Sequence, residues 1–492
     1  MSDFKPDYGI TGFGAYVPRQ RLERTAIAAA HRWMAPSLKG LAKGSRAFAS
    51  WDEDAITLAV EAVRDCLGVQ GREGVTDLAL ASTTLPFADL QNSVIVASAL
   101  GLSPSVRAVD AGGSQRAGVS ALVGGLRACA PDAVVVAADR PRAKPASVQE
   151  MVYGAGAAAF RLGADAVIAR PLGAATVSAP FVDHFRPAGA AHDYVWEERW
   201  IRDEGYAKLI PPGVDAALAQ ARVGIGDIST LVLASPLKGA AAAVAKRIGF
   251  AGVLADAHDD GCGYAGAAHP LLMLASALEA AEPGQKILLI GFGQGVDALV
   301  LETTEALAAY RPRRGVRGSI AEGVQTNDYL RMASFYGEID LEWGMRAEKT
   351  GKAALTHQYR EAHQLYAFVG GRSKATGKVE FPRLAYSVNP EHPVPVSELE
   401  DHPLADEPAK VLTFTDDWLS YHPAPPLRVG FVQFDVGARL LMEIVDVGPQ
   451  GVDIGTPLQM VFRIKEPDKA RGYNRYFWKA TPVASDTIGE QN

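Results

Sequence analysis

The sequence predicts a layered α/β body made of two similar halves, followed by a small β-barrel. The main observation is an internal repeat: residues 77–140 and 230–293 each run from an apolar strand through a glycine-rich turn and a small-residue helix to a second apolar strand. These strands are continuously apolar, which is typical of sheets covered on both faces. We therefore expect five layers, α/β/α/β/α, with the two repeated turns facing each other across a pseudo-twofold axis.

The elements of the repeat correspond one to one. Strand 77–83 matches 230–236, the turn and helix 108–126 match 254–278, and strand 132–140 matches 285–293. The two helices are rich in Ala, Gly and Leu, so we expect them to pack closely between the two sheets.

The composition defines the class of protein. A chain of 492 residues with 48% hydrophobic and 21% charged residues is long enough for two or three domains. Its net charge of -7 argues against nucleic acid as the main partner. No apolar run approaches the roughly 18 residues that span a bilayer, and the first residues lack the apolar core of a secretion signal. We expect a cytoplasmic protein that does not use a membrane.

Residues 110–122, DAGGSQRAGVSAL, are interpreted as the end of a buried strand, a glycine turn and the start of a helix. Such an elbow usually presents a nucleophile, but the residue at this turn is Gln115, which has no nucleophilic atom. Cys262 is its counterpart in the second half, and neighbouring loops bring Ser235 and Thr83 toward the same cleft. We expect Gln115 and Cys262 at helix N-termini, where unpaired N–H groups and the helix dipole favour negative charge.

These features come with a resemblance to a known family. Much of the chain between residues 9 and 295 resembles the thiolase superfamily, and within it the 3-hydroxy-3-methylglutaryl-CoA synthase branch. The matching segments are 9–22, 51–68, 153–163, 183–209, 244–250 and 291–295. The resemblance implies a thiolase-like fold, an acyl-CoA substrate and a homodimer paired through edge strands.

The resemblance also marks where this chain departs from the family. The family's catalytic cysteine falls on Gln115, and its histidine on Ala234 or, with a one-residue slip, on Ser235. Its asparagine falls on Cys262, and its acid on Thr83. None of Gln115, Ala234, Ser235 and Thr83 supplies the thiolate, imidazole or carboxylate of the ordinary synthase cycle.

Three kinds of function stay open. The first is an enzyme that makes or breaks a carbon–carbon bond beside a CoA thioester without an acyl-cysteine, by retro-aldol, retro-Claisen or decarboxylative chemistry. The second is a synthase-like acyltransferase with Cys262 as a displaced nucleophile, since a helix N-terminus lowers the pKa of a thiol. The third is a catalytically silent partner that binds acyl-CoA or serves as a scaffold.

The first kind of function needs a base outside the family's usual positions. Tyr264 lies two residues after Cys262, His258 and Asp259 lie just before it, and His269 follows further along. Each is a candidate base, and each has an alternative role as a hydrogen-bonded structural residue. Cys262 likewise has an alternative role as a small buried side chain.

Binding of CoA needs local cations in an acidic protein, because the adenosine diphosphate end carries several negative charges. Lys238, Arg116 and Arg142 are predicted on loops or helix starts near the elbows. Lys238 is the first candidate. We expect CoA thioester as a substrate and no tightly bound cofactor.

The chain is predicted to have three parts. Residues 1–310 form the thiolase-like body, residues 311–366 a basic linker and a helical segment, and residues 367–492 a degenerate zinc ribbon with an OB-fold barrel. Short alternating strands with glycine turns predict the barrel. This part resembles the OB-fold proteins that accompany thiolase-like enzymes, usually as a separate subunit with a four-cysteine zinc ribbon.

The ribbon is predicted to lack zinc. The three cysteines of the chain are widely spaced and contain no C-x-x-C pair, so neither a disulfide framework nor a cysteine-ligated zinc site is encoded. Ser373, Thr376 and Ser387 stand where the resemblance places thiols, and the segment NPEHP supplies only His392. We expect a ribbon held together by its turns.

Overall fold

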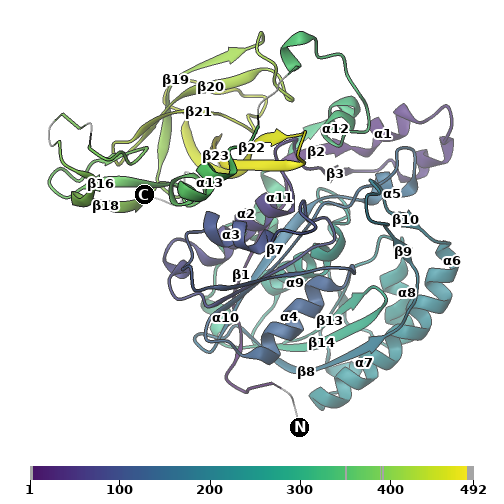
Figure 1. Ribbon diagram of the computed structural model, residues 1–492. Helices are drawn as coiled ribbons and strands as arrows, with labels where there is room; N and C mark the ends of the chain where they lie inside the picture. Colours follow the sequence, from purple (N-terminus) through teal and green to yellow (C-terminus); the bar gives the residue numbers. More distant parts are fainter. Residues whose placement is uncertain (1–3, 349–351, 388, 391–392, 485–492) are drawn as a thin grey trace. The chain divides into compact units, whose positions relative to one another are not determined.

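The structure is a computed structural model that describes residues 4–348, 352–387, 389–390 and 393–484 (Figure 1). The chain divides into two compact units. The first consists of Met1–Ser50, Asp54–Ala97 and Leu102–Met332, and the second of Trp51–Glu53, Ser98–Gly101 and Ala333–Asn492. Residues 311–332, placed by sequence in the linker part, lie in the first unit, where β15 (Val324–Thr326) pairs with β2 (Gln20–Glu23).

The first unit contains a ten-stranded sheet with two halves of the same topology. The first half has the order β5-β4-β6-β7-β1 and the second β12-β11-β13-β14-β8. Within each half the first three strands run parallel to one another, and each of the last two runs antiparallel to the strand before it. The strands are β1 (Gly9–Tyr16), β4 (Asp77–Ala81), β5 (Arg107–Ala111), β6 (Ala133–Asp139), β7 (Gly156–Gly163), β8 (Ala169–Ser178), β11 (Thr230–Leu233), β12 (Val253–Leu254), β13 (Lys286–Phe292) and β14 (Gly295–Thr303). The predicted internal duplication is confirmed.

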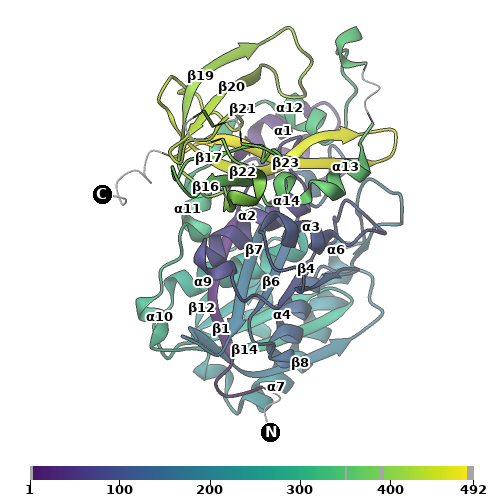
Figure 2. The same cartoon turned by 60° about the vertical axis from the view of Figure 1, so that its left-hand side comes forward.

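Helices lie between the two halves and outside them (Figures 1 and 2). The repeated helices α4 (Ala117–Ala128) and α9 (His269–Ala280) each contact strands of both halves. On the outer faces, α2 (Ala55–Leu67) packs on β1, β6 and β7, and α7 (Ala207–Ala221) packs on β8 and β14. Small residues make the central packing close, since a Cβ at Gly118 would stand 2.5 Å from the carbonyl oxygen of Ala267. This is the predicted five-layered α/β arrangement.

Shorter elements complete the first unit. They are α1 (Arg24–Ala30), β3 (Ser45–Ala47), α3 (Asn92–Ala99), α5 (Val148–Val152), β9 (His184–Phe185), β10 (Tyr194–Val195), α6 (Glu198–Trp200), η3 (Ile201–Tyr206), α8 (Ala240–Arg247), α10 (Ala306–Ala309) and α11 (Gly315–Ala321). No helix within the described residues is long and apolar enough to cross a membrane.

The second unit contains two sheets. The smaller has the order β17-β16-β18, from β16 (Val369–Ser373), β17 (Val379–Glu380) and β18 (Leu399–Pro403). The larger has the order β21-β20-β19-β22-β23, from β19 (Ala409–Asp417), β20 (Leu427–Phe434), β21 (Arg439–Glu443), β22 (Pro457–Asp468) and β23 (Tyr473–Pro482).

Residues 327–366, which belong to the part predicted as a basic linker and a helical segment, do not form one continuous helix. They form short helices, α12 (Tyr329–Phe335), α13 (Leu355–Arg360) and α14 (Ala362–Leu365). Gly337 and Gly344 adopt positive φ angles of 69°, a conformation that ends a helix and starts a turn.

The predicted zinc-ribbon positions come together beside β16 and β17. Thr376 donates its backbone N–H to Ser373 Oγ, and Asn389 donates its side-chain amide to Thr376 Oγ1. Ser387 donates its hydroxyl to Glu380 Oε2 at 2.8 Å. A cavity of about 200 Å³ lies between these turns. His392 lies outside the described residues. The side chains at the thiol positions are therefore hydrogen-bonded to backbone and to the side chains of Asn389 and Glu380.

We expect purified protein to contain well under one equivalent of zinc after dialysis against a chelator, because hydroxyl and amide groups are weak zinc ligands compared with thiolates. Within the described residues no group of three or more His, Cys, Asp or Glu side chains is placed to hold a metal ion. Elemental analysis of the full chain measures the zinc content. A full equivalent that resists chelation would contradict the prediction.

Candidate active site

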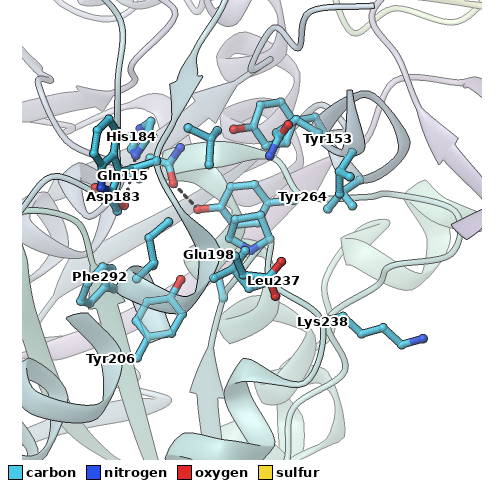
Figure 3. A pocket seen from close by; sticks show the side chains of 18 of the residues that line it. Gln115, Tyr153, Asp183, His184, Glu198, Tyr206, Leu237, Lys238, Tyr264 and Phe292 are labelled. Atoms are coloured by element: carbon cyan, nitrogen blue, oxygen red, sulfur yellow. Dashed lines mark hydrogen bonds and ion pairs between the residues drawn. The ribbon is translucent and has the colours of Figure 1, made fainter. Parts of the chain in front are cut away.

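The first unit encloses a cavity of about 380 Å³ between its two halves (Figure 3). Residues from both elbows reach it, together with α5, β9, β10, η3 and the loop after β11. Most of its lining is aliphatic or aromatic. The polar lining residues are Gln115, Gln149, Tyr153, Asp183, His184, Glu198, Tyr206, Lys238 and Tyr264. A mainly apolar cleft with a few converging polar groups is the usual form of a small-molecule site.

The first elbow carries Gln115 into this cavity. Strand β5 ends at Ala111, Gly113 turns the chain with a φ of 82°, and α4 begins at Ala117. Ser114 Oγ donates a hydrogen bond of 2.8 Å to the carbonyl oxygen of Gly293, which holds the turn against the end of β13. Gln115 is 6% exposed and lies directly before the N-terminus of α4. Gln115 thus lies at the elbow, as predicted from the sequence.

Tyr264 approaches Gln115 from the second elbow. Its hydroxyl donates a hydrogen bond of 2.6 Å to Gln115 Oε1 (Figure 3). Burial, reinforced by the neighbouring Tyr206 and Tyr153, raises the pKa of Tyr264 well above its ordinary value. The Tyr264 hydroxyl therefore stays protonated at neutral pH. Because this hydroxyl donates to the amide oxygen of Gln115, the NH₂ group of Gln115 is left to act as a donor. Tyr264 orients Gln115 and is not suited to act as a base.

A histidine–aspartate pair lines the same cavity. His184 Nδ1 lies 3.1 Å from Asp183 Oδ2, and Gln294 donates its side-chain amide to Asp183 Oδ1 at 2.9 Å. Both members of the pair are largely buried. His184 lies in the segment 183–209, which carries part of the family resemblance, but it is not among the site residues predicted from sequence. The signal was the adjacency of a carboxylate and an imidazole in the segment VDHFRP.

The surroundings of His184 set its charge. Burial has the largest effect and lowers the pKa, but the hydrogen bond and charge of Asp183 and the charge of Asp193 outweigh it, so the pKa is raised overall. Arg186 acts in the opposite direction and is itself paired with Asp193 at 2.5 Å. His184 therefore holds a proton more readily than an ordinary histidine.

The structure corrects the prediction for Cys262. The residue lies in a glycine turn seven residues before α9 begins at His269, with the 3-10 turn η5 (Gly266–Ala268) between them, so it does not sit at the helix N-terminus. It is 1% exposed and does not line the cavity. Burial raises the pKa of its thiol to about 12. At neutral pH the thiol is protonated and lacks the reactivity of a nucleophile.

Ser235 and Thr83 are also placed differently from their predicted convergence on the cleft. Ser235 is hydrogen-bonded to the Tyr206 hydroxyl at 3.0 Å, and its neighbours Ala234 and Pro236 line the cavity in its place. Thr83 Oγ1 donates to Asp139 Oδ2 at 2.7 Å and is absent from the lining. Asp139 is fully buried and also accepts from the Ala267 N–H, so its hydrogen bonds join the two halves of the body.

The remaining candidate bases lie outside the cavity. His258 has a positive φ of 48° and accepts the N–H groups of Cys262 and Gly263 at its carbonyl oxygen, which shapes the turn. His269 accepts from the Ala265 N–H at Nδ1 and contacts the Ala257 carbonyl through Nε2 at 2.9 Å. Burial lowers the pKa of His269 to about 4. None of the three candidates in this segment, His258, Asp259 and His269, lines the cavity.

The three predicted cations differ in position. Lys238 lines the cavity and is exposed, and Figure 3 shows its ammonium pointing outward at the edge of the site. Arg116 instead pairs with the buried Asp297 at 3.4 Å and is absent from the lining. Arg142 is also absent from the lining. Only Lys238 of the three is therefore positioned at this cavity.

The chain is similar in sequence to known hydroxymethylglutaryl-CoA synthases. The chain is 27% identical to the hydroxymethylglutaryl-CoA synthase of Methanosphaera stadtmanae over 348 residues, which are 68% of this chain and 99% of that enzyme. It is 28% identical to the same enzyme of Aeropyrum pernix, over 70% of this chain and 95% of that one. Residues 402–463 match the family described as ChsH2, C-terminal OB-fold domain.

Solved structures agree on the fold. An HMG-CoA synthase complexed with CoA has a TM-score of 0.56 at 17% identity, covering 70% of this chain and 94% of that one. The 3-oxoacyl-(acyl carrier protein) synthase III, FabH, from Pseudomonas aeruginosa has a TM-score of 0.53 at 23% identity, covering 60% and 98%. The chain therefore combines a body with a thiolase-like fold, similar in sequence to hydroxymethylglutaryl-CoA synthases, with a C-terminal segment that matches an OB-fold family model.

The similarity to these relatives covers about two thirds of this chain and almost the whole length of the relatives. The M. stadtmanae enzyme is matched almost completely, which leaves about a third of this chain without a counterpart in it. The OB-fold match falls within the second unit. The cavity that holds Gln115 and His184 is formed entirely by the first unit.

Proposed function

We propose that the thiolase-like body acts on an acyl-CoA thioester and makes or breaks a carbon–carbon bond beside it without forming an acyl-cysteine. The observation that carries this proposal is the elbow residue: the side chain presented to the cavity at the head of α4 is the amide of Gln115. The relatives named as hydroxymethylglutaryl-CoA synthases, and the one solved with CoA, support a CoA thioester as the substrate class.

The arrangement suits stabilisation of an enolate. Breaking or forming a bond at the carbon beside a thioester places negative charge on the thioester oxygen. The Gln115 NH₂ group can donate to that oxygen, and Tyr264 fixes the amide by donating to its other end. The adjacent N-terminus of α4 favours the same negative charge. Retro-aldol, retro-Claisen and decarboxylative reactions all pass through such an enolate and need no covalent acyl-enzyme.

The acyltransferase alternative requires Cys262 to become a thiolate. Its burial and raised pKa oppose this, and it does not border the cavity. Neither Ala234 nor Ser235 offers the imidazole that activates a thiol in the related synthases. These observations support chemistry that bypasses the acyl-cysteine.

Incubation of the full chain with a panel of acyl-CoA thioesters tests the proposed function. Mass spectrometry follows free CoA, shortened acyl-CoA and covalent adducts. Release of an aldehyde or ketone indicates retro-aldol cleavage, and loss of carbon dioxide indicates decarboxylation. An acyl adduct on Cys262 would instead establish the acyltransferase, and the absence of any reaction would support a silent partner.

We expect Lys238→Ala to weaken CoA binding roughly fivefold, because one exposed charge-assisted contact to a phosphate contributes about 1 kcal/mol. Isothermal titration calorimetry with CoA measures the effect. Lys246→Ala is the matched control, since Lys246 is an exposed lysine of α8 outside the cavity lining. Equal weakening in both variants would assign the effect to overall charge and remove Lys238 from the site.

A further inference from the structure

The pair Asp183–His184 has the construction of a general base. Asp183 is held at Oδ1 by Gln294 and faces His184 Nδ1 with Oδ2. A proton on Nδ1 then points at the carboxylate, and the neutral imidazole keeps its lone pair on Nε2. Both residues line the cavity that holds the Gln115 amide. Retro-aldol and retro-Claisen cleavage, unlike decarboxylation, need a base in this cavity, and the candidates predicted from sequence do not supply one.

We infer that His184 is the base that removes the hydroxyl proton of a 3-hydroxyacyl-CoA, so that the body catalyses retro-aldol cleavage of 3-hydroxyacyl thioesters with an apolar chain. This inference rests on the proposed function and selects one of its reactions. Asp183 and Gln294 act as positioning residues, because they fix the tautomer and direction of the imidazole.

The step balances without a further reactant. His184 Nε2 takes the proton from the hydroxyl on Cβ, and the oxygen–hydrogen electron pair forms the carbonyl of the leaving aldehyde. The Cα–Cβ bond breaks, and its electron pair becomes the enolate of the thioester, whose oxygen accepts from the Gln115 NH₂ group. The protonated His184 then returns its proton to Cα, which gives acetyl-CoA from a substrate unsubstituted at Cα.

The side chains that line the cavity favour a substrate with an apolar acyl chain. Beyond the polar groups, the cavity is walled by side chains such as Val152, Val195, Ile201, Leu237 and Phe292. The acidic and basic side chains in the lining other than His184 are Asp183, Glu198 and, at the edge of the site, Lys238. Glu198 already pairs with Arg202 at 2.5 Å. A second carboxylate on the substrate would meet two acidic residues, whereas an aliphatic chain is favoured by burial.

The charges around His184 predict how the rate depends on pH. The groups that act on it are Asp183 beside it, Asp193 from the start of β10, and Arg186, which is paired with Asp193. The base is active when neutral, so kcat/KM rises with pH through the pKa of His184. Because that pKa is raised, the acid limb lies above the ordinary value for histidine. Asp193→Asn removes a negative charge and leaves Arg186, so the limb moves to lower pH.

The test uses 3-hydroxyoctanoyl-CoA with the full chain, and it measures hexanal and acetyl-CoA. We expect the parent to release both in equal amounts. His184→Gln keeps the size and polarity of the side chain and should lower kcat at least a hundredfold, the usual contribution of a general base. Asp183→Asn should lower kcat with little change in KM, since it stabilises the wrong tautomer. His363→Gln is the matched control, because His363 pairs with Asp401 at 3.1 Å in the second unit.

The outcomes separate this inference from the proposed function. If no thioester reacts, both fail. If the parent decarboxylates or condenses thioesters but never releases an aldehyde, the inference is overturned and the proposed function stands. Cleavage that survives His184→Gln, or an acid limb that Asp193→Asn does not move, removes His184 as the base. Equal kcat/KM for 3-hydroxy-3-methylglutaryl-CoA and 3-hydroxyoctanoyl-CoA would contradict the apolar chain.

Discussion

Replacing Gln115 by alanine is expected to lower kcat for cleavage by about a hundredfold to a thousandfold, while CoA binding and the melting temperature change little. One preorganised donor to a developing oxyanion typically contributes about 3 to 4 kcal/mol to the transition state. In the proposed mechanism Gln115 is such a donor, because Tyr264 holds its oxygen and the glycine turn before α4 fixes its backbone. Steady-state kinetics on the reactive thioester, with calorimetry for CoA, measures both quantities.

A matched change elsewhere isolates the effect. Gln325→Ala removes an exposed glutamine of β15 in the same unit and should leave kcat unchanged. If Gln115→Ala is as active as the parent, the cavity performs its chemistry without the elbow amide, and the proposed mechanism is wrong.

The reverse experiment installs a thiol at the elbow. Gln115→Cys should not give multiple-turnover condensation, since Ala234 and Ser235 provide no imidazole and Thr83, bound to Asp139, provides no carboxylate. It should still trap an acyl group slowly. A stable acyl adduct on the introduced thiol, seen by intact mass, would locate the thioester at this elbow. Full synthase turnover would refute the claim that the catalytic set has been replaced.

The fold could be predicted because the sequence features that specify it lie within short segments and occur twice in the chain. Continuous apolar runs such as those that form β6 and β13 require covered sheet faces, and glycines such as Gly113 permit the sharp turn that presents Gln115. The error at Cys262 has a local cause too. Gly261, Gly263 and Gly266 all adopt positive φ, so the chain turns repeatedly and the helix starts only at His269.

The proposed base, His184, was not predicted from sequence because the residue that holds its partner is distant in sequence. His184 lies on a two-residue strand with no strong periodicity, and the residue that holds its partner Asp183 is Gln294, 111 positions later. Neither apolar pattern nor motif spacing encodes such a contact. The ion-pair cluster of the second unit has the same character, because Lys479 and Asp52 are 427 positions apart.

That cluster buries several charges together. Lys479 is 1% exposed and its ammonium contacts Asp52 Oδ2 at 2.9 Å and Glu443 at 3.0 Å, over the ring of Trp51 at 4.3 Å. His422 contacts the same Glu443 at 2.9 Å. Burial has the largest effect on Glu443 and raises its pKa, but Lys479 and His422 outweigh it and hold the pKa at about 2. The carboxylate is therefore stabilised by its partners.

Lys479→Met is expected to lower the free energy of unfolding of the second unit by about 3 to 5 kcal/mol at neutral pH, because it leaves Asp52 and Glu443 buried without their shared cation. Lys374→Met, which breaks an exposed pair with Glu400 at 3.6 Å, should cost under about 1 kcal/mol. Hydrogen exchange in β22 and β23, followed by mass spectrometry, measures the opening free energy of this unit directly.

The pH dependence identifies the cause of that loss. In the parent, the folded pKa of Glu443 at about 2 lies below its unfolded value of about 4.3, so its stabilising contribution is complete above the unfolded value and is lost as pH falls toward 2. Without Lys479 that depression weakens, so the gap in stability between variant and parent should narrow as pH falls through this range. A gap that stays constant with pH would show that Lys479→Met acts through packing around Trp51 rather than through charge.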